Sequence, residues 1–401
     1  MARSSASSSE RLGSGGVPAA VTRVYLDYAG FSPVDPRVVA VMRPFLEGGV
    51  GNPSTPHSLG LEARASLDGA RAKVARLFGG SPSGVIFTSS ATEANNLAIA
   101  GLAERASGRH LATSAIEHVS VLNACRDLEK RGWAVTYVGV DAEGRVDPDA
   151  VRRALRPDTV LVSVMAASGE IGTLEPIAEV GRIARRQGVP VHVDAVGAAG
   201  RVALSVDECA IDLLTLSSND LYGPPGAGAL WARPEIKLAP RILGGGQERG
   251  FRSGTENLPA IVGMGVAADL ARLERQAEVA RLRELRDGLL EGILERVPGV
   301  RITGARGAAR LPHHASVVLP DVKADSILLE LDLRGVAAST GSACNALTGE
   351  PSHVLRAIGC TQAEAEGSLC FTLGRWTTTA EIDLVIETLP LVVDRLRRLA
   401  P

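Results

Sequence analysis

The feature of this sequence that most constrains its fold is a series of short apolar runs that alternate with amphipathic segments. Seven of these runs are rich in strand-forming residues. Their alternation with helical patterns predicts an α/β fold, in which helices cover both faces of a largely parallel sheet. The last two runs lie close together, as in a hairpin-like pair. In chain order, the runs are VIFTSS ending at Ser90, HLATS at Ser114, AVTYVGV at Val140, VLVSVMA at Ala166, VPVHVDAV at Val196, LLTLS at Ser217 and AGALWAR at Arg233.

The pattern changes near Gly263, where a long charged helix with apolar residues at helical spacing begins. Beyond this helix, short strands are mixed with amphipathic helices, which is typical of an α+β layer. A chain of 401 residues suits one large domain and a smaller one. We therefore predict a flexible tail over 1–22, a large domain with a mostly parallel seven-stranded sheet over 35–263, and a small α+β domain made of 23–34 and 264–401.

Charge and cysteine content narrow the classes of partner and compartment. The formal net charge is −2, from 43 basic and 45 acidic residues, and no Lys/Arg run follows a helix face, so we expect no nucleic-acid partner. The first sixteen residues carry no apolar stretch, and we expect neither a secretory signal nor a membrane span there. The five cysteines are scattered and form no CxxC motif, which predicts reduced thiols and a cytoplasmic location.

Polar residues that follow the apolar runs are the candidate ligand contacts, because ligands of open parallel sheets gather beyond the carboxyl ends of the strands. After Phe87, the segment TSSATEANN opens a helix around Thr92 whose free N–H groups could hold a phosphate, although an ordinary helix start has the same pattern. His118 lies at the next strand-to-helix junction, where a structural role is the alternative. Asp194 ends a strongly apolar run. A cationic ring nitrogen would explain a carboxylate there, and a helix cap is the alternative.

These segments, in this order, resemble the class V aminotransferase family, and specifically the cysteine desulfurases that serve iron–sulfur cluster assembly. The resemblance covers nearly the whole chain from Val24 onward. It implies a pyridoxal-phosphate (PLP) dependent transferase of fold type I and a homodimer, with the active site between the large domain, the small domain and the partner subunit. The segments that carry it are VYLDYAG, GNPSTPHSLG, FTSSATEANNLAI, IEHVSVL, VSVMAASGEIGTLEPI, VHVDAVGAAG, YGPPGAGALW, GGGQERGFRSGTEN and STGSACNALTGEPSHVLRAIG.

The resemblance assigns cofactor-binding roles to five positions. His118 corresponds to the residue that stacks on the pyridine ring, and Asp194 to the carboxylate that pairs with the ring nitrogen. Thr92 and Ser217 correspond to phosphate ligands. Thr255 corresponds to a residue that approaches the phosphate from the neighbouring subunit.

Cys344 corresponds to the family's loop thiol, which takes sulfur from cysteine as a persulfide and passes it on. Because Cys344 is flanked by Ser, Gly and Ala, we expect its thiol to be exposed and reachable. Thiolate is also the favoured donor to iron in iron–sulfur clusters. The resemblance to desulfurases of cluster assembly also implies a partner, which would be an iron–sulfur scaffold protein or another sulfur acceptor.

The sequence departs from the family after the sixth predicted strand. There the family has Ser-x-His-Lys, whose lysine forms the Schiff base to PLP, whereas Asn219 and Asp220 hold the last two positions here. A carboxylate cannot condense with an aldehyde, and it adds negative charge near the cofactor phosphate. The four lysines lie away from strand ends, so covalent attachment of PLP is not expected. They are Lys73, Lys130, Lys237 and Lys323.

Further departures also fall on cofactor and substrate contacts. The family's arginine for the substrate carboxylate is Cys370, and its glutamine after the ring-pairing aspartate is Gly197. An Asn-Asn-Glu triplet is Ser168-Gly169-Glu170, and an Ala-Thr-Thr triplet is Gly30-Phe31-Ser32. The RSGT turn and the Cys344 segment are kept.

Three functional hypotheses follow. The first is a sulfur-transfer or cluster-assembly protein in which Cys344 acts as persulfide carrier or cluster ligand. Asp220 and Cys370, with His118 nearby, could hold a metal, so Cys344, Asp220 and Cys370 are the candidate metal ligands. The second is a slow cysteine desulfurase that holds PLP without a covalent bond. The third is an enzyme of altered chemistry that uses Asp220 as a general base. A turn cap is the alternative for Asp220, and a small apolar filler is the alternative for Cys370.

One minor motif is the pair His313-His314, which precedes the apolar run ASVVLP. Two adjacent histidines could bind a metal. An exposed turn is the favoured interpretation.

Overall fold

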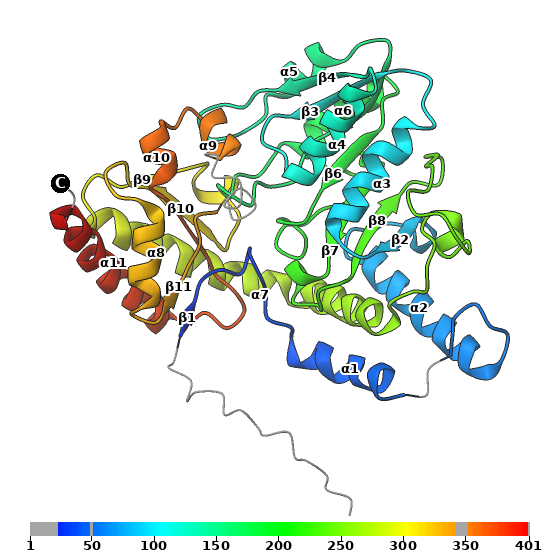
Figure 1. Ribbon diagram of the computed structural model, residues 1–401, viewed down its shortest axis with the longest axis horizontal. Coiled ribbons are helices and arrows are strands. Elements are labelled where there is room, and N and C mark those ends of the chain that lie inside the picture. The colour runs from blue at the N-terminus through cyan, green and yellow to red at the C-terminus, as the bar shows by residue number, and fades with distance from the viewer. Residues whose placement is uncertain (1–22, 49–50, 342–351, 400–401) are drawn as a thin grey trace, which may run out of the picture.

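The computed structural model describes residues 23–48, 51–341 and 352–399 (Figure 1). Its largest element is a seven-stranded sheet with the order β2-β8-β7-β6-β5-β3-β4. β8 runs antiparallel to both of its neighbours and the other pairs are parallel, so the predicted α/β class, the largely parallel sheet and the hairpin-like last pair are confirmed. The strands are β2 (Val85–Thr88), β3 (His110–Ser114), β4 (Ala134–Val138), β5 (Thr159–Ser163), β6 (Val191–Asp194), β7 (Leu213–Ser217) and β8 (Gly228–Ala232).

Helices pack on both faces of this sheet. α3 and α4 bury their apolar residues in the cluster on one face, and α2, α5 and α6 bury theirs in the cluster on the other. The helices of this part of the chain are α1 (Pro36–Glu47), α2 (Ser58–Arg76), α3 (Ala91–Ala103), α4 (Val119–Lys130), α5 (Pro148–Ala154) and α6 (Ile177–Arg186).

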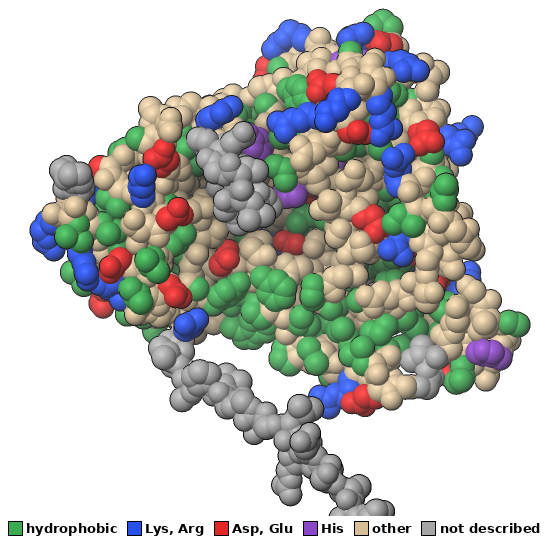
Figure 2. Space-filling model, viewed as in Figure 1, with side chains coloured by type: hydrophobic (Ala, Val, Ile, Leu, Met, Phe, Trp, Pro, Cys, Tyr) green, Lys and Arg blue, Asp and Glu red, His purple; other side chains and the backbone are tan. Residues whose placement is uncertain are grey.

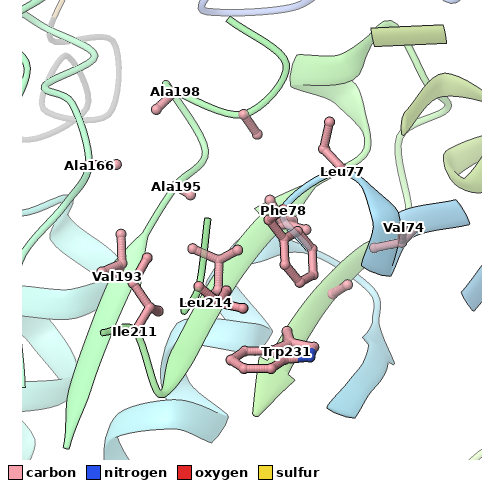
Figure 3. Packing of buried hydrophobic residues seen from close by; sticks show 14 of the residues in the cluster. Val74, Leu77, Phe78, Ala166, Val193, Ala195, Ala198, Ile211, Leu214 and Trp231 are labelled. Carbon is pink, nitrogen blue, oxygen red and sulfur yellow. The ribbon is translucent and has the colours of Figure 1, made fainter. Parts of the chain in front are cut away.

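Side chains along the central strands alternate between these two apolar clusters. Leu214 and Trp231 belong to one cluster, whereas their chain neighbours Leu213 and Leu230 belong to the other. A strand that is covered on both faces needs apolar residues at every position, which explains the nearly continuous apolar runs. Figure 3 shows the cluster that contains Leu214 and Trp231. In it, the rings of Phe78 and Trp231 pack edge to face at a centroid distance of 5.9 Å.

The C-terminal part of the chain forms a second, smaller core. An antiparallel sheet has the order β12-β10-β9, and β1 pairs in parallel with β11, so the segment that begins with β1 joins the C-terminal part. The exact domain boundaries stay a prediction. The elements are β1 (Val24–Tyr25), β9 (Arg301–Ile302), β10 (His314–Val318), β11 (Val336–Ala337), β12 (Ser368–Thr372), α8 (Ala324–Asp332), α9 (His353–Ala357), α10 (Gln362–Glu366) and α11 (Thr379–Leu399).

One long helix, α7 (Leu258–Arg296), contributes to both cores (Figure 1). Met264 in its first half is buried with the large sheet, and Leu289 in its second half is buried in the smaller core. The helix starts a few residues before the predicted start near Gly263, because the side chain of Asn257 caps it by accepting from the backbone N–H of Ala260. No helix within the described ranges has the length and apolar character needed to cross a bilayer.

The role of α7 in the smaller core predicts the effect of truncating Leu289, which is fully buried. We expect Leu289→Ala to lower the free energy of unfolding by about 2 to 5 kcal/mol, because it leaves a cavity among packed side chains. The matched control is Leu294→Ala on the same helix, since Leu294 is 38% exposed; its effect should stay below about 1 kcal/mol. Urea-induced unfolding followed by circular dichroism measures both, and equal losses would contradict this packing.

Candidate active site

A cavity of about 420 Å³, here called the strand-end cavity, lies where the large sheet meets the smaller core. Its wall includes the segments that follow β3, β5, β6 and β7 and the first turns of α3. The smaller core closes it with residues of β10, β12 and α9. The carboxyl ends of the parallel strands therefore open into this space, as expected for ligand sites in such sheets.

The strand-end cavity brings together most of the predicted site residues. It is lined by Thr92, His118, Asp194, Ser217, Asp220 and Cys370. Thr255 is not part of this wall and lines a separate cavity of about 170 Å³ with Arg252, so its predicted approach from a neighbouring subunit stays a prediction. Cys344 lies outside the described residues.

Asp194 closes β6 and is 6% exposed. Its Oδ2 accepts a hydrogen bond from Nδ2 of Asn95 at 2.8 Å, and its Oδ1 accepts one from the backbone N–H of Val196 at 3.1 Å. No helix starts between β6 and β7, a segment that is described throughout, so Asp194 is not the helix cap considered from the sequence, and the bond from Val196 closes a local turn. These two donors fix the orientation of the Asp194 carboxylate in the cavity wall. Because a buried carboxylate is stabilised by an opposite charge, a cationic group of a ligand would be a suitable partner.

His118 caps the start of α4, and the same network orients its ring. Nδ1 accepts from the backbone N–H of Ser120 at 3.2 Å, so the proton of a neutral ring is carried by Nε2. The Ser120 hydroxyl lies 2.8 Å from Nδ1 and accepts from Asn95 Nδ2 at 2.9 Å. Asn95 thus connects Asp194 to His118 through Ser120.

Asn95 is fully buried, and the sequence analysis missed it. The available signal was an asparagine in the middle of an otherwise apolar face of α3, where a side-chain amide needs partners. Its Oδ1 has no hydrogen-bond partner among the described residues, although Asn95 lines the strand-end cavity. A buried amide oxygen without a donor marks a place where a ligand or a water would be stabilised.

Asp220 lies in a short 3₁₀ turn directly after β7. Burial raises its pKa to about 6, while the Arg201 guanidinium and a hydrogen bond from Ser217 act in the opposite direction. Arg201 Nη1 also donates to the backbone oxygen of Asp220 at 2.7 Å. The N-cap position of the turn belongs to Ser218, so Asp220 does not act as the cap considered from the sequence.

Cys370 is buried on β12, with its Sγ 3.2 Å from Nε2 of His314. Burial raises the pKa of the thiol and lowers that of His314 to about 3, so both groups are neutral near pH 7. The exposed turn predicted for His313 and His314 is wrong, because β10 starts at His314 and pairs with β12, which buries both rings. The neutral thiol agrees with the apolar-filler interpretation of Cys370.

A metal site is not formed by the described part of the chain on its own. Residues 23–48, 51–341 and 352–399 contain no group of three or more His, Cys, Asp or Glu side chains that could hold a metal ion. His118, Asp220 and Cys370 therefore do not form a metal centre with one another, although they share the cavity. The predicted metal set that adds Cys344 stays a prediction.

The wall of the strand-end cavity is acidic. Its described residues include five carboxyl groups and one guanidinium, that of Arg201. Burial raises the pKa of Glu170 to about 7, against a hydrogen bond from Ser352, and raises that of Glu117 well above its usual range. The carboxyl residues are Asp27, Glu117, Glu170, Asp194 and Asp220.

The donor set fits a vitamin B6 phosphate. Asp194 can face a ring nitrogen and His118 a ring face, while the first turn of α3, with Ala91 and Thr92 in the wall, offers N–H groups to a phosphate. The unsatisfied Asn95 oxygen is an independent sign of a missing polar partner. None of the four lysines of the chain, all of them described, lines the cavity.

Comparison with known proteins gives consistent matches. A family model described as Aminotransferase class-V matches residues 24–385. A protein named cysteine desulfurase IscS 1 from Archaeoglobus fulgidus is 45% identical over 379 residues, which cover 94% of this chain and 98% of that protein. A cysteine desulfurase IscS from Dictyoglomus turgidum is 45% identical over 380 residues, with 94% and 96% covered. A solved structure titled NifS-like protein superimposes with a TM-score of 0.87 at 34% identity, covering 93% of this chain and all of that one.

The raised pKa of Glu170 predicts a pH dependence of stability. Because this carboxyl has a pKa of about 7 when folded and 4.5 ordinarily, the unfolded chain ionises it first. Its contribution to folding is therefore complete below about pH 4.5 and is lost as the pH rises through about 7. We expect Glu170→Gln to reduce the fall in unfolding free energy over this range. Urea unfolding at several pH values measures it, and the control is exposed Glu62→Gln; a parent-like curve for Glu170→Gln would contradict the assignment.

Proposed function

The chain belongs to the class V aminotransferase family, and from this premise we propose that it serves in sulfur transfer and iron–sulfur cluster assembly without tethering PLP. Relatives that match 94% of the chain are named cysteine desulfurases, which supports a sulfur-handling role. The fold and the strand-end cavity are compatible with a B6 cofactor pocket of that family. The proposal concerns the chemistry that this chain retains.

The observation that carries the proposal is the identity of the group after β7. Asp220, a carboxyl, lines the strand-end cavity at the position that we assign to the family's Schiff-base lysine. None of the four lysines lines this cavity, and Lys130, Lys237 and Lys323 are exposed. Since imine formation needs a primary amine, the described wall residues offer no side chain that could form an imine with an aldehyde.

If PLP is bound, it supplies an electron sink for carbanion chemistry, and the chain's contribution is to hold it. Asp194 would carry the hydrogen bond to the ring nitrogen, with its orientation set by Asn95 and Val196. His118 would lie against the ring. Cys370, buried and neutral, offers no positive charge for a substrate carboxylate.

Cys344 is the proposed sulfur site, acting as persulfide carrier or as ligand to an iron–sulfur cluster. The partner would be a scaffold protein or another sulfur acceptor. We also propose a homodimer. Figure 2 shows hydrophobic side chains gathered along one edge of the molecule, over α1 and the adjoining part of α7. Val39, Val41 and Leu46 of α1 are exposed, and exposed apolar patches of this kind are typical of interaction surfaces.

A second candidate function is an enzyme of altered chemistry in which Asp220 acts as a general base. The observation that favours it is the pKa of about 6, which keeps the carboxyl close to the range in which it can both accept and release a proton. A slow desulfurase with PLP held non-covalently would also need such a base in place of the lysine. The visible spectrum of the purified protein separates these functions: a B6 band favours the desulfurase, and broad bands with bound iron favour cluster assembly.

Replacing Asp220 by lysine tests the missing amine. We expect Asp220→Lys protein, incubated with PLP and reduced with borohydride, to gain the mass of one cofactor at that residue, whereas the parent gains none there. Desulfurase turnover should stay low, because Cys370 provides no cation for the substrate carboxylate. Exposed Asp207→Lys is the matched control for nonspecific attachment. Recovery of ordinary desulfurase turnover by Asp220→Lys would show that this account of Cys370 is wrong.

Persulfide formation tests the role of Cys344. A low-molecular-weight persulfide transfers its outer sulfur to an attacking thiolate, and the donor leaves as a thiol. We expect alkylation and mass spectrometry to find the added sulfur on Cys344, and Cys344→Ser to abolish it. The control is Cys209→Ser, since Cys209 is a free, partly exposed thiol. Equal labelling of the parent and Cys344→Ser would rule out Cys344 as the carrier.

A further inference from the structure

We propose that the strand-end cavity selects the amine form of the B6 phosphate, pyridoxamine 5′-phosphate, over the aldehyde form PLP, and that Asp220 binds the ammonium group of this ligand. The inference rests on the proposed non-covalent B6 pocket. It is independent of the sulfur role of Cys344, because it concerns only side chains in the cavity wall.

The first argument is charge. The described wall carries five carboxyl groups against the single guanidinium of Arg201, and Arg201 Nη1 already donates to the backbone of Asp220. The amine form carries a positively charged ammonium at the carbon where the aldehyde form carries a neutral carbonyl. Because burial raises the pKa of Glu117 and Glu170, these two carboxyl groups add little negative charge, and the attraction depends on the other carboxyl groups, Asp220 above all. A carboxylate at Asp220 attracts the amine form more strongly than the aldehyde form, so that one charge separates two ligands of nearly the same shape.

The second argument is that a bound cation would stabilise the charged form of the Asp220 carboxyl. Asp220 lines the cavity, and its carboxyl receives a hydrogen bond from Ser217 that favours the charged form. Burial and the Asp194 carboxylate disfavour that charge and raise the pKa of Asp220 to about 6. A cation placed beside Asp220 removes this penalty and lowers the pKa again. A carbonyl has no proton to donate and offers no such compensation.

The third argument is that the rest of the ligand has its own contacts. Asp194 is oriented for a ring nitrogen by Asn95 and Val196, and the first turn of α3 faces the same cavity. Several buried polar atoms of the wall have no hydrogen-bond partner among the described residues. They are Oδ1 of Asn95, Oε2 of Glu117, Nε of Arg201, Oδ1 of Asn219 and Nδ1 of both His313 and His314. These unsatisfied groups indicate a polar ligand. The wall also has room, since a Cβ added at Gly169 would meet nothing within 4 Å.

The test is a binding titration of the purified full-length protein near pH 7.5, by calorimetry or ligand fluorescence, with pyridoxamine 5′-phosphate and PLP as separate probes. We expect the amine form to bind at least about tenfold more tightly, the difference that one hydrogen bond between charged groups provides. Asp220→Asn keeps the shape and removes the charge, and it should abolish this preference. Asp207→Asn, on an exposed side chain, is the matched control and should keep it. Circular dichroism of each variant verifies folding.

Three outcomes would overturn the proposal: PLP binding as tightly as the amine form, neither probe binding, or Asp220→Asn keeping the parent's preference. Pyridoxamine without its phosphate provides a further check, because its affinity should fall if the first turn of α3 holds the phosphate; unchanged affinity would contradict the placement of the ligand. The persulfide-labelling experiment tests Cys344 independently of the binding titration. A failed binding titration would therefore contradict the ligand proposal without contradicting the proposed sulfur function.

Discussion

The carboxyl group of Asp220, which follows β7 at the position that we assign to the family's Schiff-base lysine, is the constraint on which our account depends. Asp220 faces a cavity that it shares with Asp194, and the two carboxyl groups raise the cost of charging each other in a buried space. A site with this charge pattern favours cations and hydrogen-bond donors. Under our proposal, the chain keeps the geometry of a B6 pocket but not the reaction that fastens the cofactor to the protein.

The turn that carries Asp220 is itself held between the two cores. Tyr222 follows Asp220 by two residues and adopts a left-handed conformation with φ 61°, which costs energy in a bulky residue. Its hydroxyl donates to Glu278 of α7 at 3.0 Å and accepts from the backbone N–H of Arg375 at 2.9 Å. Arg375 also pairs with Asp35, ahead of α1. These contacts tie the floor of the cavity to both parts of the molecule and hold Asp220 in one place.

Much of this arrangement could be predicted from the sequence because parallel strands end at a common edge. The seven apolar runs became the seven strands, and residues at or just beyond their carboxyl ends, including His118, Asp194 and Asp220, meet in one cavity. The apolar pattern predicts where each strand ends, and the carboxyl ends of parallel strands lie at the same edge of the sheet, so residues there can be assigned to one site. The pairing of β7 with β8 followed from their short separation in the same way.

Contacts between distant segments could not be predicted. The role of Asn95 depends on the approach of α3 to both β6 and α4, and nothing in its local pattern specifies those neighbours. His314 was expected in an exposed turn, yet it pairs with β12, more than fifty residues later, and its ring meets Cys370. The polarity of the cavity wall likewise appears only when both cores are assembled, because its five carboxyl groups come from five separate segments.

The most direct test of the central claim is a crystal structure of the protein grown in the presence of PLP. Our account predicts that any density for the cofactor is separate from every side chain, with the Asp220 carboxylate beside it and unmodified. Continuous density between the cofactor's aldehyde carbon and a side chain of this protein in the strand-end cavity would contradict the account.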